Sequence, residues 1–188
     1  MTRHSLALKS YSRLSHLLLT SPSFLCLLFL WGVNDHYFKY AYPSFWTGKL
    51  SDITSLACTP VLMWICQVYL LCFVAKLLNK PEFENSLITS LSRWAYILMT
   101  LNALAMAFLM IAINIDPYWA SLYKVGLAWV QWPFWVMWYE IQWGFSPPFP
   151  QIQLTMDPSD AWTAPAAFLS LFLLHNKLKA VPMKLKVL

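Results

Sequence analysis

The stretch "NDHYFKYAYPSFWTGKLSDITSL", residues 34–56, separates two apolar segments of the chain and carries several charged side chains. The apolar run before it ends at Val33, and the run after it begins at Ile53. Over the whole chain 59% of the residues are hydrophobic and only 11% are charged, whereas soluble domains carry about 25% charged residues. This balance predicts an all-α integral membrane protein, because a soluble fold could not bury so much apolar surface.

Four segments are predicted to cross the membrane as helices, at about residues 17–40, 53–78, 94–115 and 161–176. The first resembles a signal peptide, but no small-residue cleavage site follows it, so we expect a retained helix. The clearly apolar part of the fourth, Ala161–Leu174, is shorter than the roughly 17 residues that a span needs and must recruit its flanks. We therefore predict a four-helix transmembrane bundle that forms one domain over residues 1–188.

An aromatic segment precedes the last predicted span. Six of the 11 tryptophans lie there, namely Trp119, Trp129, Trp132, Trp135, Trp138 and Trp143. Tryptophan favours the headgroup zone of a bilayer, and Pro133 and Lys124 argue against a simple fifth span. We predict that residues 117–142 form one or two helices in the outer interface. The alternative is a re-entrant helix pair broken at Pro133.

The distribution of charge favours four spans with both termini in the cytoplasm. This topology places ten of the 13 basic residues inside, namely Arg3, Lys9, Arg13, Lys76, Lys80, Arg93, Lys177, Lys179, Lys184 and Lys186. Most of the carboxylates then lie outside, as the positive-inside rule favours, and a fifth span would separate the charges less cleanly. The placement indicates a lipid bilayer as partner rather than a nucleic acid, and we expect a bacterial inner membrane.

Most of the charged residues of the predicted outer side fall in two stretches. Each stretch holds a Ser-Asp pair just before a predicted span, Ser51-Asp52 and Ser159-Asp160, as is typical of residues that cap a helix. Ionisable groups near a membrane also mark functional sites by default. We therefore predict one polar binding cluster, made of Asp35, His36, Lys39, Lys49, Asp52, Asp157 and Asp160. The alternative is two capped helices and one solvated ion pair between Asp35 and Lys39.

The sequence contains no pattern typical of an enzyme or a metal site. It has no HExxH motif and no catalytic serine motif, and "TGKLS" departs from the phosphate-loop pattern at Pro43 and Leu50. The four cysteines lie in apolar runs without a CxxC pair, which favours packing over disulfides or metal binding. His16 and His175 could in principle hold a haem, but histidines at helix ends need no cofactor, and we predict neither cofactor nor metal.

The polar stretches resemble signatures of a known family. "NDHYFKYAYPSFWTGKLSD" is similar to the NDH-x-x-K…P…TGKLSD signature of a group of uncharacterised bacterial multi-pass membrane proteins, and "DPSDAWTAP" resembles their DPTDL-x-x-LP stretch. The resemblance covers about a fifth of the chain and implies a small helical membrane bundle. The matching positions are Asn34, Asp35, His36, Lys39, Lys49, Ser51, Asp52, Asp157, Pro158 and Asp160. Thr54-Ser55 and Ala161-Trp162 depart from the family pattern, so helix packing there is expected to differ.

These observations favour a non-catalytic membrane module that binds a partner protein, a lipid or a small solute through the outer Asp/Lys cluster. A proton, ion or solute pathway is an alternative, although only Gln67 and Asn102 are polar well inside the second and third spans, and neither titrates. A further alternative is an enzyme acting on a lipid-linked substrate, with an aspartate or His36 as general base. The absence of an enzymatic motif favours the binding module over the enzyme without deciding between them.

Overall fold

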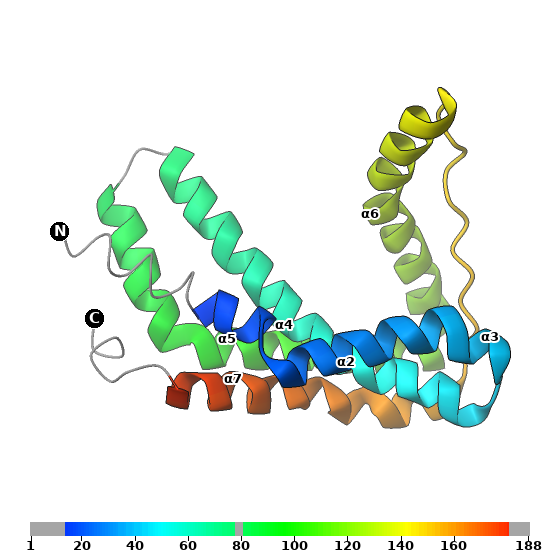
Figure 1. Cartoon of the computed structure of the whole chain (residues 1–188), viewed down its shortest axis with the longest axis horizontal. Coiled ribbons are helices and arrows are strands. Elements are labelled where there is room, and N and C mark those ends of the chain that lie inside the picture. Colours follow the sequence, from blue (N-terminus) through cyan, green and yellow to red (C-terminus); the bar gives the residue numbers. More distant parts are fainter. Residues whose placement is uncertain (1–13, 78–80, 181–188) are drawn as a thin grey trace. The chain divides into compact units, whose positions relative to one another are not determined.

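The protein is all-helical. A computed structural model describes residues 14–77 and 81–180, with the backbone alone at residues 75, 76, 81–94 and 180. Residues 14–19 are helical, and no strand occurs in these ranges. The elements that follow are α2 (Pro22–Val33), the π-helix η1 (Asn34–Phe38), α3 (Lys39–Ala41), α4 (Phe45–Leu77), α5 (Pro81–Ile115), α6 (Pro117–Trp143), the 3₁₀-helix η2 (Pro158–Phe168) and α7 (Leu169–Ala180) (Figure 1).

The chain divides into two compact units. The first comprises Met1–Ala107 and Thr163–Leu188, and the second comprises Phe108–Trp162. Within the described part of the chain, two helices are long and apolar enough to cross a membrane, namely α4 over Phe45–Val74 and α5 over Ala95–Ile115. They contain most of the second predicted span and nearly all of the third. A single transmembrane domain with four spans stays a prediction.

The first predicted span is interrupted near its start. Ser21 is the N-cap of α2, and its hydroxyl oxygen accepts a hydrogen bond from the Phe24 N–H at 3.2 Å, with Pro22 in the first turn. Both features are typical of a helix start, so a new helix begins here instead of continuing from residue 17. Beyond Val33 the chain widens into a π-helix before α3 ends at Ala41.

Helix α4 begins earlier than the hydropathy of the sequence predicts. Ser44 and Thr47 form a capping box, in which the Thr47 N–H donates to Ser44 Oγ at 3.2 Å and the Ser44 N–H donates to Thr47 Oγ1 at 3.0 Å. This reciprocal pair satisfies two otherwise unpaired donors at the start of the helix. Ser51 and Asp52 consequently lie inside α4, and the prediction that they cap this helix is wrong.

The core of the first unit lies where α2, α4, α5 and α7 meet. Its largest members, Leu18, Phe24, Trp64, Met99 and Leu174, are at most 1% exposed. When helices associate in a bilayer, apolar side chains exchange contacts with lipid chains for contacts with one another, so no water is released. Close packing and polar pairs, not the hydrophobic effect, would therefore hold these helices together.

Helix α4 changes direction along its length (Figure 1). Pro60 lies inside it and has no N–H to donate to the carbonyl of Leu56, four residues earlier. An internal proline also clashes with that carbonyl, which is an ordinary cause of a kink.

The second unit is organised by α6. Asp116 caps this helix by accepting a hydrogen bond from the Tyr118 N–H at 2.8 Å, and Gly144, with φ of 69°, ends it. The helix continues through Pro133, so residues 117–142 form one helix and not a pair broken at that proline. Residues 145–157 are extended and return alongside α6 (Figure 1).

Helix η2 carries the second Ser-Asp pair. Asp157 precedes the helix, and its side chain accepts a hydrogen bond from the Ser159 N–H at 2.8 Å. The Asp160 N–H donates to the Asp157 carbonyl at 2.8 Å. Asp157 therefore caps the start of η2, and Ser159 and Asp160 lie in the first turn of this helix. Eleven residues in a 3₁₀-helix exceed the usual run of three or four.

Candidate functional site

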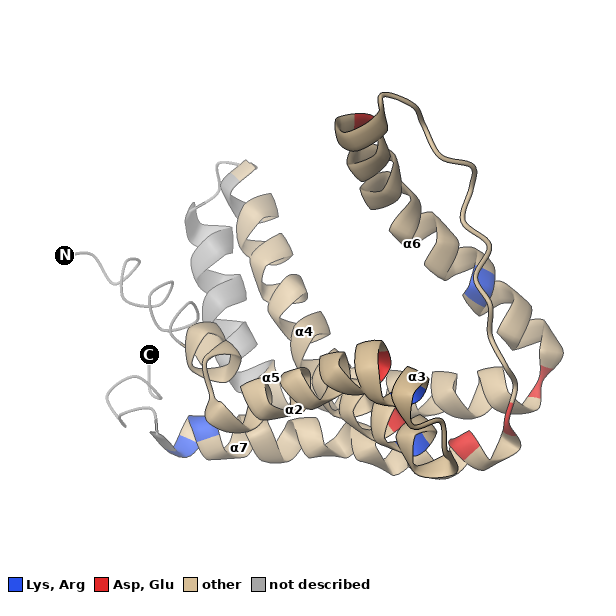
Figure 2. Ribbon diagram, turned by 45° about the vertical axis from the view of Figure 1, so that its right-hand side comes forward, with Lys and Arg blue, Asp and Glu red and all other residues tan. Residues whose placement is uncertain are grey.

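The candidate site lies where the π-helix η1 meets the first turns of α4. Asp35 belongs to η1, and its Oδ1 atom accepts a hydrogen bond from Ser51 Oγ at 2.5 Å. The same oxygen is 2.9 Å from Lys39 Nζ, one helical turn further along. The carboxylate thus joins two elements that are 16 residues apart in the sequence. Figure 2 shows charged residues gathered around α3 and the start of α4.

The pKa of Asp35 is lower than that of an ordinary aspartate. Partial burial acts to raise the pKa, because it disfavours the charged form. Hydrogen bonds from Ser51 and Lys39, together with the positive charge of Lys39, outweigh burial and lower it. Asp35 lies outside both helices that could cross a membrane. The carboxylate is therefore held as an anion in a defined orientation, while its side chain keeps 34% of its surface accessible.

Two further polar side chains of the site are buried. Lys49 is 8% exposed, and its Nζ atom lies 4.9 Å from the centre of the Phe45 ring, where the ring quadrupole attracts a cation. Asn34 is fully buried, and its side-chain N–H donates to the Thr47 carbonyl at 2.6 Å. Its Oδ1 atom has no hydrogen-bond partner among the described residues. A buried acceptor left in this state costs about 1–3 kcal/mol.

Exposed aromatic side chains flank the site. The exposed fraction is 82% for Tyr40 and 77% for Trp46, and Tyr37, Phe38 and Tyr42 form a cluster of ring contacts between 5.6 and 6.5 Å. Tyrosine and tryptophan are typical of the membrane–water interface. The sequence placed most of the outer aromatic residues in the segment before the last span and did not indicate this group, which we call the 37–46 rim.

The structure brings together only part of the predicted cluster. Asp35 and Lys39 are in direct contact, and His36 is exposed. Lys49 and Asp52 both lie in the first turns of α4. Asp157 and Asp160 belong to the other compact unit, where the Asp157 N–H donates to Asn114 Oδ1 at 3.2 Å. That these two residues join the Asp35 group stays a prediction.

Three site residues were outside the predicted binding set. Asn34 appeared only as a position of the family resemblance, Ser51 appeared there and as half of a Ser-Asp pair, and Thr47 was not singled out. A Ser-x-x-Thr pattern directly after Pro43 is the signal that could have indicated an earlier start for α4, and hence a position for Ser51 inside the helix.

Deeper in the first unit, α4 and α5 share a neutral polar pair. Gln67 Nε2 donates to Asn102 Oδ1 at 3.0 Å, and Asn102 Nδ2 donates to Gln67 Oε1 at 3.1 Å. Both side-chain amides are thereby satisfied across the two helices. Neither group titrates, so the pair can fix helix packing but cannot carry a proton as an acid or base would.

No metal-binding group was found in the described ranges. Among the residues whose side chains the structure describes, no group of three or more His, Cys, Asp and Glu is placed to hold a metal. His175 Nδ1 is 3.0 Å from the Tyr96 hydroxyl, a contact that connects α7 to α5.

Comparisons of the chain with family models, with curated proteins and with solved structures find no match.

Proposed function

We propose that the protein is a multi-pass membrane protein that binds a partner, without catalysis, through the Asp35 site. The binding residues are Asp35, Lys39, Lys49 and Asp52, with Ser51 orienting the Asp35 carboxylate. The observation that carries this proposal is the carboxylate held between Ser51 and Lys39 at a helix junction, directly beside the 37–46 rim. His36, Asp157 and Asp160 belong to the proposed site through the family resemblance.

The proposed topology has four spans, with both termini in the cytoplasm of a bacterium and the Asp35 site on the outer face of the inner membrane. Two observations support this topology. Two long apolar helices are present, and ten of the 13 basic residues fall in the segments predicted to be cytoplasmic. Reporter fusions at residues 1 and 188 test it, because both ends should report the cytoplasm. Ends on opposite sides of the membrane would contradict this topology.

A membrane protein partner fits the site better than a small solute or a lipid. Tyrosine and tryptophan are enriched among residues that dominate protein–protein binding energy, and Tyr40 and Trp46 are the most exposed aromatic residues of the rim. An oriented ion pair beside such anchors adds specificity more than affinity. The rim would therefore supply contact area, and Asp35 would select the partner.

Site-specific photocrosslinking tests this function. A photoreactive amino acid at Tyr40 should give a discrete protein adduct in native membranes, and a matched probe at Leu70, which is 60% exposed in the C-terminal third of α4, should not. The substitution Asp35→Asn should reduce the Tyr40 adduct about tenfold, because a hydrogen bond to a charged group contributes about 1.5–3 kcal/mol. An adduct that is the same at both positions, or that is unaffected by Asp35→Asn, would refute the binding role.

A further inference from the structure

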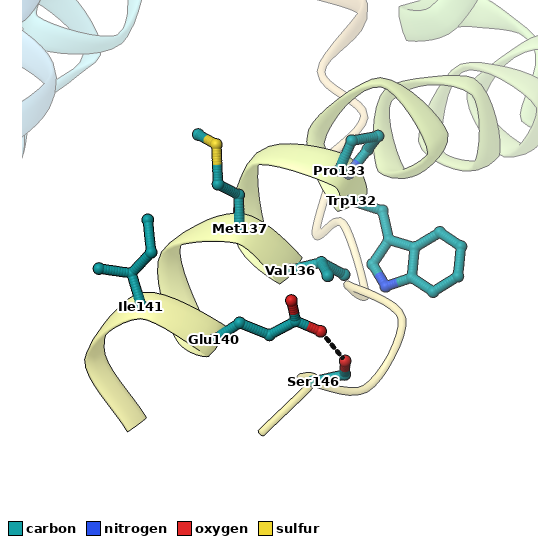
Figure 3. A pocket seen from close by; sticks show the side chains of 7 residues that line it. All are labelled: Trp132, Pro133, Val136, Met137, Glu140, Ile141 and Ser146. Atoms are coloured by element: carbon teal, nitrogen blue, oxygen red, sulfur yellow. Dashed lines mark hydrogen bonds between the residues drawn. The ribbon is translucent and has the colours of Figure 1, made fainter. Parts of the chain in front are cut away.

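The second unit contains a groove that the proposed function does not use. Helix α6 and the chain that follows it line an open groove of about 730 Å³. The walls of the groove are mostly apolar, and the polar groups that line it include the Glu140 carboxylate and the Ser146 hydroxyl. Figure 3 shows Glu140 reaching toward Ser146, with Val136 on the same side of the helix and Met137 and Ile141 on the adjacent side.

The groove depends on the chain reversal after α6. Gly144 adopts the left-handed conformation, with φ of 69°, which glycine tolerates without steric cost. The reversal allows Ser146 Oγ to donate to Glu140 Oε1 at 2.7 Å. Further along, the Phe149 ring packs against Trp129 and Trp132, with centroids 5.2 and 5.6 Å apart. The carboxylate is consequently held at the edge of the groove, with capacity for further donors.

The charge of the groove selects for a cationic group. Glu140 is the only carboxylate in α6, and the nearest basic residue of the helix is Lys124, more than four turns earlier. An ammonium with N–H donors can form a charge-assisted hydrogen bond with Glu140. A quaternary ammonium has the same charge but no N–H, so it cannot form this bond.

An exposed apolar stripe leads away from Glu140 along α6. Ile141, Met137, Phe134 and Val130 are between 57% and 76% exposed, and their spacing of four, three and four residues places them on one helix face. Membrane helices that pack together favour small residues at the contact, so these bulky side chains suit acyl chains better than a second helix. From Glu140 to Val130 is ten residues, about 15 Å along the helix axis.

We propose that this groove binds one phospholipid whose headgroup carries a primary ammonium, of the ethanolamine type. The ammonium binds Glu140 beside Ser146, and an acyl chain lies along the stripe from Ile141 to Val130. The inference rests on the membrane location of the chain, but it is independent of partner binding at Asp35.

The experiment uses the full chain in vesicles that contain equal amounts of ethanolamine, choline and glycerol phospholipids. The protein is extracted in mild detergent, and retained lipids are quantified by mass spectrometry. We expect wild-type protein to retain ethanolamine lipid over choline lipid, and Glu140→Gln to reduce that preference about tenfold, which corresponds to the loss of one charged hydrogen bond. The double variant E140Q/Q142E keeps the net charge but moves the carboxylate to another helix face, and it should resemble Glu140→Gln.

Several results would overturn the proposal. Equal retention of ethanolamine and choline lipids by the wild-type protein would do so without any variant. So would preference for the anionic glycerol lipid, full retention by E140Q/Q142E, or a dimer that Ile141→Ser dissociates, because a second copy would then cover the stripe. The Tyr40 crosslink should be unchanged in Glu140→Gln, which separates failure here from failure of the Asp35 function.

Discussion

The amide pair between α4 and α5 allows a quantitative test of how the first unit is held together. Asn102 is 5% exposed and exchanges two hydrogen bonds with Gln67, at 3.0 and 3.1 Å. The substitution Asn102→Leu removes both bonds, together with a longer one of 3.5 Å from Asn102 Nδ2 to the Pro60 carbonyl, and leaves the Gln67 amide without its partner. In the double variant Gln67→Leu/Asn102→Leu, no polar side chain remains unpaired at this position.

The expected magnitude follows from the number of bonds and from their surroundings. Hydrogen bonds between membrane helices average about 0.6 kcal/mol, with a maximum near 1.7 kcal/mol. Two bonds therefore correspond to about 1–3 kcal/mol, the same range as the cost of leaving one polar group unsatisfied. We expect each single leucine substitution to lower the free energy of unfolding by about 1–3 kcal/mol. The double variant should be destabilised by less than the sum, with a coupling of at least about 1 kcal/mol.

The assay is reversible unfolding by sodium dodecyl sulfate in mixed micelles, followed by tryptophan fluorescence. Leu101→Ala is the control on α5, because Leu101 is 55% exposed and its truncation should change the free energy by no more than about 0.5 kcal/mol. Single effects that add within about 0.3 kcal/mol would mean that the two amides do not stabilise the helix pair jointly.

Two further predictions concern Asp35 and the end of α6. The folded-state pKa of Asp35 is lowered, so the ionised carboxylate stabilises the folded protein. This contribution is complete above the unfolded-state pKa of about 3.9 and is lost as the pH falls through the folded-state pKa. Thermal unfolding midpoints should therefore decline more steeply on acidification for the wild-type protein than for Asp35→Asn. Equal slopes in the two proteins would contradict the lowered pKa. Gly144→Ala should destabilise the protein by about 1 kcal/mol, because alanine is strained at a φ of 69°. The control Gly126→Ala lies in the interior of α6 with no atom within 4 Å of the added Cβ, and it should be neutral or stabilising by up to about 1 kcal/mol. Calorimetric unfolding midpoints compare the two variants, and a Gly144→Ala protein as stable as the wild type would rule out the conformational argument.

The helical class and the positions of the two longest apolar helices are readable from the sequence, because both depend on local properties. Apolar runs of membrane length predict helices over residues 53–78 and 94–115, and the structure has α4 and α5 there. The i,i+4 spacing of Asp35 and Lys39 likewise predicts their contact, and the ion pair is present at 2.9 Å.

Helix boundaries were harder to predict because hydropathy and helix formation respond to different forces. Hydropathy placed the start of the second span at Ile53, but the helix begins at Phe45. There the side chains of Ser44 and Thr47 accept hydrogen bonds from backbone N–H groups that would otherwise be unpaired. At Ser21 a side-chain cap starts a new helix within an otherwise apolar region. A helix can extend through polar residues, since its hydrogen bonds are made within the backbone.

Pairings between distant residues required the folded chain. Ser51 with Asp35, and Gln67 with Asn102, are separated by 16 and 35 residues. Periodicity predicts which face of a helix each side chain occupies, but not which other helix that face contacts. Composition and short-range spacing thus predict the all-helical class and the two membrane-length helices found among the described residues, because those properties are local along the chain. The partners of Asp35 and Asn102 depend on helix packing, which no local pattern specifies.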